Sequence, residues 1–156
     1  MKIIGDKIEL LPYTIERCHE FWKDYVADND MLDEKYTYDE NWVKKYYQVK
    51  VLVQNRKYFA ICRKGKIIGE IQLKNIDFND KSGTMSVHLS NNIYKNKGFG
   101  TEAQQLLLDY AFNCLGLECI YADTILRNKR SQYILEKLGF IKIREDVSLK
   151  YYKLNR

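Results

Sequence analysis

Hydrophobic and polar positions follow two periods along this chain, and the changes between them divide it into helices and strands. Apolar residues recur every three or four positions over Ile15–Val26, directly after Thr14, whose side chain is a good helix N-cap. The same spacing predicts a second helix over Trp42–Lys50, a third over Ala103–Cys114 and a fourth over Asn128–Gly139. The pattern therefore indicates helices in four separate parts of the chain.

Strand patterns occupy most of the remaining sequence. Thr84–Ser90 alternates cleanly, with Met85, Val87 and Leu89 on one face and polar side chains on the other. The other predicted strands are Lys7–Leu11, Tyr58–Arg63, Lys66–Lys74, Glu118–Ile125 and a pair within Phe140–Lys153. The element order is βααβββαβαββ, which predicts a mixed α/β sheet with helices on its faces.

Length and composition fit a single folded domain spanning residues 1–156. A chain of this length can bury a core without metals or disulfides. Hydrophobic residues make up 46% and charged residues 30%, which excludes a disordered tail. No apolar run is long enough for a membrane span, and the N-terminal segment has acids where a secretion signal needs an apolar stretch. We therefore expect a cytoplasmic protein without a membrane partner.

The four cysteines, Cys18, Cys62, Cys114 and Cys119, lie among apolar neighbours at helix or strand spacing. None forms a C-x-x-C pair, and the two histidines of the chain do not complete a zinc-ligand pattern with them. No metal is expected for this reason. We expect all four cysteines to be buried structural thiols, which favours a reducing compartment.

The net charge of +5 becomes informative only where basic residues gather. The chain has no basic stripe or module typical of nucleic-acid readers, so no nucleic acid partner is expected. Lys95 and Lys97 instead flank a glycine loop, and Arg127, Lys129 and Arg130 surround the start of the fourth predicted helix. Two basic clusters at helix starts indicate a local site for an anion.

The loop Asn91–Gly100 carries the clearest functional signal. It leads into the third predicted helix through Lys97-Gly98-Phe99-Gly100-Thr101, where unpaired backbone N–H groups and the helix dipole favour an anion. Glycines in such a loop let a ligand approach the backbone closely. The loop lacks both the P-loop ending and the third glycine of the dinucleotide fingerprint. It therefore predicts a phosphate site of another class.

With these motifs together, residues 66–140 resemble the GNAT superfamily of acetyl-CoA-dependent N-acetyltransferases. The family's Q/R-x-x-G-x-G/A loop is matched by Lys95-Asn96-Lys97-Gly98-Phe99-Gly100. Thr101-Glu102-Ala103, Asn128-Lys129-Arg130-Ser131 and Leu135-Glu136-Lys137-Leu138-Gly139-Phe140 resemble the branch of ribosomal-protein N-terminal acetyltransferases. The resemblance implies an α+β fold with a mostly antiparallel central sheet and helices on both faces.

The resemblance also implies how acetyl-CoA would bind. Backbone amides from Lys97 to Thr101, with Asn96 beside them, would hold the CoA pyrophosphate. The backbone of Val87, His88 and Leu89 would pair with the pantetheine arm like an added strand.

The fourth predicted helix would complete that site by the same resemblance. Asn128 would hydrogen-bond the pantetheine arm, or simply cap the helix, or do both. Ser131, one turn further, would face the sulfur, although a surface role is the alternative. Lys95, Lys129 or Arg130 would meet the CoA phosphates.

The acid and base of the reaction are less clearly specified. Many family members carry a tyrosine acid at the position of Leu135, so Ser131 becomes the better-placed proton donor. Tyr133 does not substitute, because two residues along a helix it points about 200° away from Ser131. His88 or Glu70, directly or through water, is the expected general base, the alternative for His88 being a hydrogen bond within the sheet.

The resemblance implies direct transfer of an acetyl group from acetyl-CoA to a primary amine. A lysine amine with a pKa of about 10.4 is rarely neutral at pH 7, whereas an α-amine near about 8 needs little help. A protein or peptide N-terminus is therefore the expected acceptor. The alternatives are a small amine, such as a polyamine or an aminoglycoside-like compound, and a non-catalytic acetyl-CoA-binding regulatory module. A monomer and a homodimer both remain compatible with the sequence.

Overall fold

The computed structural model describes residues 1–28 and 35–156. The strands are β1 (Ile3–Ile4), β2 (Glu9–Pro12), β3 (Lys57–Arg63), β4 (Lys66–Asp77), β5 (Ser82–Leu89), β6 (Cys119–Ile125), β7 (Ile141–Glu145) and β8 (Leu149–Asn155). The helices are α1 (Ile15–Asp24), α2 (Glu40–Tyr46), α3 (Phe99–Asn113) and α4 (Lys129–Lys137), with a π-helical turn η1 (Tyr47–Val51) and a 3-10 turn η2 (Asn92–Tyr94).

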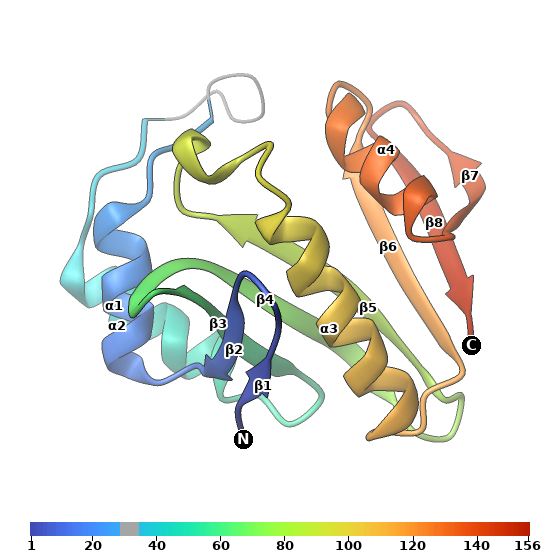
Figure 1. The fold of residues 1–156 in the computed structure, drawn as a ribbon, viewed down its shortest axis with the longest axis horizontal. Helices are drawn as coiled ribbons and strands as arrows, with labels where there is room; N and C mark the ends of the chain where they lie inside the picture. Colours follow the sequence, from blue (N-terminus) through green and yellow to red (C-terminus); the bar gives the residue numbers. More distant parts are fainter. Residues whose placement is uncertain (29–34) are drawn as a thin grey trace.

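The strands form one sheet in the order β1-β2-β3-β4-β5-β6-β8-β7 (Figure 1). Every neighbouring pair is antiparallel except β5 and β6, which run parallel. This arrangement confirms the predicted mixed, mostly antiparallel sheet. The parallel pair takes the fifth and sixth places in this order.

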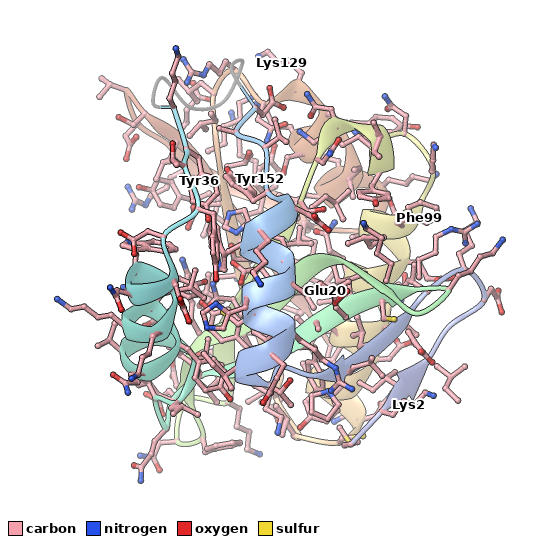
Figure 2. All side chains as sticks on the ribbon, turned by 90° about the vertical axis from the view of Figure 1, so that its left-hand side faces the viewer. Lys2, Glu20, Tyr36, Phe99, Lys129 and Tyr152 are labelled. Atoms are coloured by element: carbon pink, nitrogen blue, oxygen red, sulfur yellow. The ribbon has the colours of Figure 1, made fainter. Side chains whose placement is uncertain are left out.

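Helices cover both faces of the sheet, as expected. Strand β3 shows the two layers, because its residues alternate between separate cores. Phe59 and Ile61 belong to the core beneath α3, whereas Tyr58 and Ala60 belong to the core beneath α1 and α2. Figure 2 looks onto the second face, where α1 and α2 lie in front of the sheet.

The first predicted strand, Lys7–Leu11, differs from the observed structure. The chain forms two strands there, and β1 pairs with β2 through Ile3 and Ile4. The observed order therefore has one strand more than βααβββαβαββ. A two-residue strand has no measurable period, so the sequence pattern gives no sign of it. The resulting N-terminal hairpin contacts the loop before α3 through Lys7.

The second predicted helix is also shorter than its pattern suggests. Helix α2 ends at Tyr46 and continues as the π-helical turn η1. Val43 is fully buried, but Val49 is 52% exposed, so the apolar stripe does not continue to the end of the predicted range. Val51, the last residue of η1, instead packs against the core beneath α1 and α2.

Only two of the four cysteines are buried, whereas all four were expected to be. Cys18 and Cys62 are buried, but Cys119 is only partly buried and Cys114 is exposed. Cys114 was expected on the buried face of the third helix, yet it lies just beyond the last residue of α3, where that face no longer continues.

Thiol accessibility gives a direct check. Burial raises the pKa of Cys18 to about 12 and also raises the pKa of Cys62, which suppresses the reactive thiolate. With a thiol-reactive dye at pH 7.5, we expect Cys114 to react first, and Cys18 and Cys62 only after unfolding. The Cys114→Ser variant should lose the fast phase; a fast phase that persists in this variant would contradict the placement of Cys114.

Candidate active site

Strands β5 and β6 diverge after a short parallel contact. They pair only at Ser82 with Cys119, Gly83 with Ile120 and Thr84 with Tyr121. Beyond these pairs the two strands separate toward one end of the sheet (Figure 1). Within the described chain, no strand pairs with the side of β5 that faces β6 after Thr84. Its backbone N–H and C=O groups are therefore available to a ligand.

A cavity of about 610 Å³ occupies the opening between these strands. Its walls come from Met85–Leu89 of β5, Ala122–Ile125 of β6, the start of α4, and the segment that follows α1. Eight of the predicted site residues line it: Val87, His88, Leu89, Lys95, Asn96, Gly100, Asn128 and Ser131. Most of the predicted site is thus brought together around one cavity.

The start of α3 forms one side of this cavity. Gly98 precedes the helix with a positive φ of 84°, and no side chain caps the helix there. The first intrahelical bond runs from the Glu102 N–H to the Gly98 carbonyl, so the N–H groups of the preceding turn have no partner within the helix. Gly100 lines the cavity, which places this N-terminal turn beside it. An anion would be stabilised at this position.

The other predicted loop residues take different positions. Lys97, Gly98, Phe99 and Thr101 do not line the cavity. Phe99 is 5% exposed and packs in the core beneath α3. Any contribution from these four residues to ligand binding would come from backbone N–H groups.

The basic residues divide into two groups. Lys95 lines the cavity but forms an ion pair with Asp28, which joins the loop before α3 to the segment after α1. Arg130 also lines the cavity and is half-buried, whereas Lys129 is exposed and lies outside the lining. Burial lowers the pKa of Arg130, but an arginine remains protonated at neutral pH. Arg130 is thus the better-placed cation at the start of α4.

Asn128 caps α4, as one of the two interpretations anticipated. Its Oδ1 accepts a hydrogen bond of 3.0 Å from the Ser131 N–H. Both residues line the cavity, so the cap also fixes the first turn of α4 against it. Tyr133 is 64% exposed and points away, as its helical position predicts.

Glu70 lies at the centre of a buried polar cluster beneath α1 and α2. This side chain is 2% exposed and accepts hydrogen bonds from the Tyr13 hydroxyl at 2.8 Å and the Tyr46 hydroxyl at 2.9 Å. The Tyr46 hydroxyl in turn lies 3.0 Å from that of Tyr58. Burial, reinforced by the charge of Glu70, raises the pKa of both Tyr13 and Tyr46, so both remain neutral donors.

His88 connects this cluster to the cavity. It faces Glu70 across the β4–β5 pair, and its Nδ1 lies 3.3 Å from Glu70 Oε1. The His88 side chain is 55% exposed and lines the cavity, whereas Glu70 is almost fully covered. With a proton on Nδ1, His88 donates to Glu70 and leaves Nε2 as a free acceptor.

Leu135 supplies no hydroxyl at the position where the resemblance implies a tyrosine. Its side chain is 3% exposed, packs in the core beneath α3 and also reaches the cavity wall. Ser131 is the hydroxyl residue of the α4 start on that wall.

Sequence reasoning missed Tyr13 and Tyr46 as partners of Glu70. Both hydrogen bonds join residues far apart in sequence, 57 positions for Tyr13 and 24 for Tyr46. The abundance of tyrosine in the first third of the chain was the only available signal.

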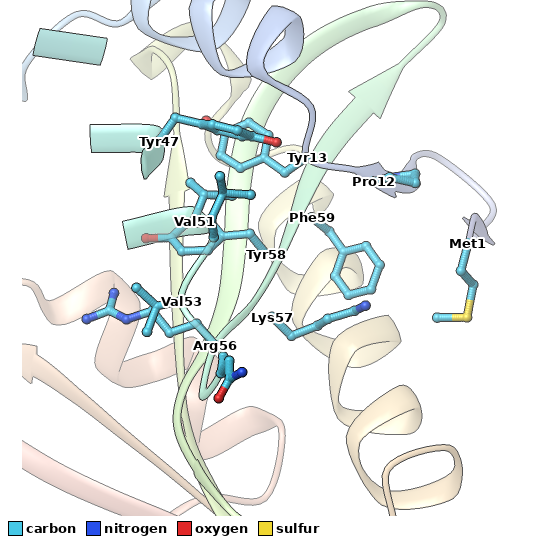
Figure 3. A pocket seen from close by; sticks show the side chains of 12 residues that line it. Met1, Pro12, Tyr13, Tyr47, Val51, Val53, Arg56, Lys57, Tyr58 and Phe59 are labelled. Carbon is cyan, nitrogen blue, oxygen red and sulfur yellow. The ribbon is translucent and has the colours of Figure 1, made fainter. Parts of the chain in front are cut away.

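A second, smaller cavity of about 360 Å³ lies near the start of β3 (Figure 3). Tyr13 and Tyr58 line it, and their rings stack with centroids 5.6 Å apart. It contains none of the predicted site residues. Among the described residues, no group of acidic, histidine or cysteine side chains is arranged to hold a metal ion. Over the same ranges, no helix is both long and apolar enough to cross a membrane.

The chain is similar in sequence to several N-acetyltransferases. The chain is 27% identical to the Mus musculus alpha/beta-tubulin-N-acetyltransferase 9 over 152 residues, covering 88% of this chain and 63% of that protein. It is 25% identical to the Escherichia coli spermidine N(1)-acetyltransferase over 121 residues, covering 74% and 64%. The chain therefore spans less than two thirds of the length of these relatives.

Solved structures agree on the fold. A spermidine N-acetyltransferase from Vibrio cholerae superposes with a TM-score of 0.77 at 17% identity, covering 97% of this chain and 95% of that one. A candidate ribosomal-protein-serine acetyltransferase from Vibrio cholerae gives a TM-score of 0.81 at 13% identity, covering 100% and 98%. The Acetyltransferase (GNAT) domain family matches residues 7–141. With its splayed strands and uncapped glycine turn, the chain thus belongs to the GNAT acetyltransferase family.

Proposed function

We propose that this protein transfers the acetyl group of acetyl-CoA to the primary amine of an acceptor. One observation carries the proposal: a single cavity is bordered by an uncapped helix start, an unpaired strand side and a histidine backed by a buried carboxylate. These are the parts that binding a thioester cosubstrate and deprotonating an amine require.

Acetyl-CoA fits the residues of this cavity as a cosubstrate that supplies the activated acetyl group. The N–H groups at the start of α3 would hold its pyrophosphate, and Arg130 would add a positive charge. The free side of β5 from Met85 to Leu89 would pair with the amide groups of the pantetheine arm. One of these N–H groups would also polarise the thioester carbonyl.

His88 is the proposed general base, and Glu70 orients it. The exposed imidazole edge faces the cavity, so Nε2 would take the proton of the acceptor amine. Glu70 would hold the Nδ1 proton and stabilise the imidazolium that results. Of the two base candidates, His88 is favoured because Glu70 is covered by its own hydrogen-bond donors.

Ser131 is proposed to stabilise the departing thiolate by a hydrogen bond from its hydroxyl, which keeps its own proton. A thiol with a pKa near about 8.5 is a tolerable leaving group, so CoA can leave as the thiolate and take a proton from water. Leu135 at the adjacent wall would keep this end of the cavity apolar.

The proposed acceptor is the N-terminal amine of a protein or peptide. The acidic side chains that the structure describes on the cavity wall are Asp28 and Asp123, and Asp28 pairs with Lys95. A polyamine carries several positive charges and would require more carboxylates than these. Three further acids of the connection after α1, Asp30, Asp33 and Glu34, lie outside the described residues. The similarity to a spermidine N(1)-acetyltransferase keeps a polyamine as the competing acceptor.

Release of CoA thiol from acetyl-CoA tests the proposal. The acceptor panel contains peptides with a free N-terminus, the same peptides with a blocked N-terminus and an internal lysine, and spermidine. We expect turnover with the free N-termini and at least tenfold lower kcat/KM with the other two. Faster turnover with spermidine would make the polyamine the acceptor, and acetyl-CoA binding without any turnover would indicate a regulatory module.

The pH dependence of His88→Ala isolates the base. At pH 6.5 we expect kcat/KM for the amine to fall by about 10²-fold, because a general base typically contributes 10²–10⁴-fold. The defect should shrink as the pH rises past about 8, where an α-amine is neutral without help. A pH–rate profile that is unchanged from the parent protein would remove His88 from the mechanism.

A further inference from the structure

The N-terminal hairpin of β1 and β2 is fastened to the first turn of α3 by one carboxylate. Glu102 Oε1 accepts from the Asp6 N–H at 3.0 Å, and Oε2 accepts from the Lys7 and Ile8 N–H groups at 3.0 and 2.8 Å. Hydrogen bonds from N–H groups to an ionised carboxylate are about twice as strong as neutral ones. Three consecutive amides of the hairpin turn are thus satisfied by a residue of α3.

The hairpin also contacts the glycine loop itself. Lys7 Nζ donates to the Lys97 carbonyl at 3.2 Å. Arg63 Nη1 donates to the Lys7 carbonyl at 2.9 Å, and the Arg63 guanidinium lies 4.6 Å from the centre of the Phe99 ring. These contacts reach Lys97 and Phe99, the residues on either side of Gly98.

Gly5 allows the hairpin to approach this closely. A Cβ atom at Gly5 would lie 2.9 Å from Glu102 Oε2, from the Ile8 carbonyl oxygen and from Leu106 Cδ1. The Gly5 N–H also closes the hairpin turn by donating to the Ile8 carbonyl at 2.9 Å. A side chain at position 5 would therefore push Glu102 away from the amides that it accepts.

Glu102 does not line the large cavity, so it does not belong to the ligand contacts. It lies instead in the first turn of α3, next to the N–H groups that would hold the CoA pyrophosphate. We propose that Glu102 is a positioning residue, which clamps the N-terminal hairpin to α3 and so keeps Lys97–Thr101 in the conformation that binds the pyrophosphate. The inference rests on the proposed acetyl-CoA site.

Glu102→Gln removes the charge with little change in size. A glutamine offers one carbonyl oxygen to three N–H donors, and its own N–H₂ group faces them. We expect CoA to bind about tenfold more weakly in titration calorimetry, as the loss of a charge-assisted contact predicts. Amide hydrogen exchange at Lys97–Thr101 should also become faster without CoA. Glu9→Gln is the matched control, because Glu9 lies on the same hairpin and pairs with Lys2 instead.

Two more variants keep the test decisive if Glu102→Gln folds poorly. Gly5→Ala places a Cβ against Glu102 and so disturbs its hydrogen bonds from the hairpin side. Lys7→Met removes the side-chain hydrogen bond to the Lys97 carbonyl. We expect both to weaken CoA binding, and Gly5→Ala combined with Glu102→Gln to cost less than the sum of the two. Unchanged CoA affinity and exchange in the folded variants would overturn the clamp. Failure of the parent protein to bind CoA would instead refute the proposed function, and hydrogen exchange would still test the clamp.

Discussion

Replacing Glu70 by glutamine is expected to lower kcat/KM for the acceptor amine by up to about 10²-fold at neutral pH, the full effect expected for His88→Ala. The carboxylate is 2% exposed and accepts from two tyrosine hydroxyls and, when His88 carries its proton on Nδ1, from His88. Glutamine is neutral, so it would no longer stabilise the imidazolium form of His88. Its N–H₂ group would also have to face one of these three donors, which favours the wrong tautomer of the histidine.

Steady-state kinetics at several pH values and calorimetric titration of acetyl-CoA measure this effect. We expect acetyl-CoA affinity to stay within about twofold, because Glu70 does not line the cavity. Glu16→Gln, an exposed change on α1, controls for the substitution itself. Combining Glu70→Gln with His88→Ala should add little to the single defects, since both act on the same proton transfer. Full additivity would argue that the two residues act separately.

Much of the fold could be predicted because its strands and helices bury complete faces. The alternation in Thr84–Ser90 and the helical spacing of Ala103–Leu107 follow from burial against one core, and both correspond to observed elements. The hairpin strand Ile3–Ile4 could not be predicted in this way. Its position depends on pairing with β2 and on the distant Glu102, and neither leaves a period in the sequence.

In the candidate site, too, local features could be predicted from the sequence and tertiary contacts could not. The glycine loop and the first turn of α4 are local features, and the resemblance to the GNAT family implied that both belong to one site; residues of both line the same cavity. Glu70 and His88 were expected on neighbouring strands, and their register brings them opposite each other. The donors to Glu70 come from a strand end and from α2, so only the tertiary structure identifies Tyr13 and Tyr46. The pairing of Lys95 with Asp28 is likewise a tertiary contact that the sequence did not predict.

Gly98→Val is expected to weaken acetyl-CoA binding by about 10–100-fold, with a matching loss of kcat/KM for acetyl-CoA. Gly98 has a φ of 84°, and a β-branched residue is a marked outlier in that region. Its Cβ would lie 2.8 Å from Lys7 Nζ, so the substitution also displaces the hairpin contact to the loop. The N–H groups at the start of α3 would then no longer converge on one anion.

Gly65→Val separates this local effect from general strain. Gly65 has a similar φ of 82°, but a Cβ there would meet nothing within 4 Å, and the residue lies in the turn between β3 and β4. We expect both variants to unfold at lower temperature, and only Gly98→Val to lose acetyl-CoA affinity. Gly98→Asn should be milder, because asparagine tolerates the left-handed region better than valine. If Gly98→Val and Gly65→Val bound acetyl-CoA equally well, the glycine turn before α3 would not be the anion site, and the cosubstrate would have to bind elsewhere in the cavity.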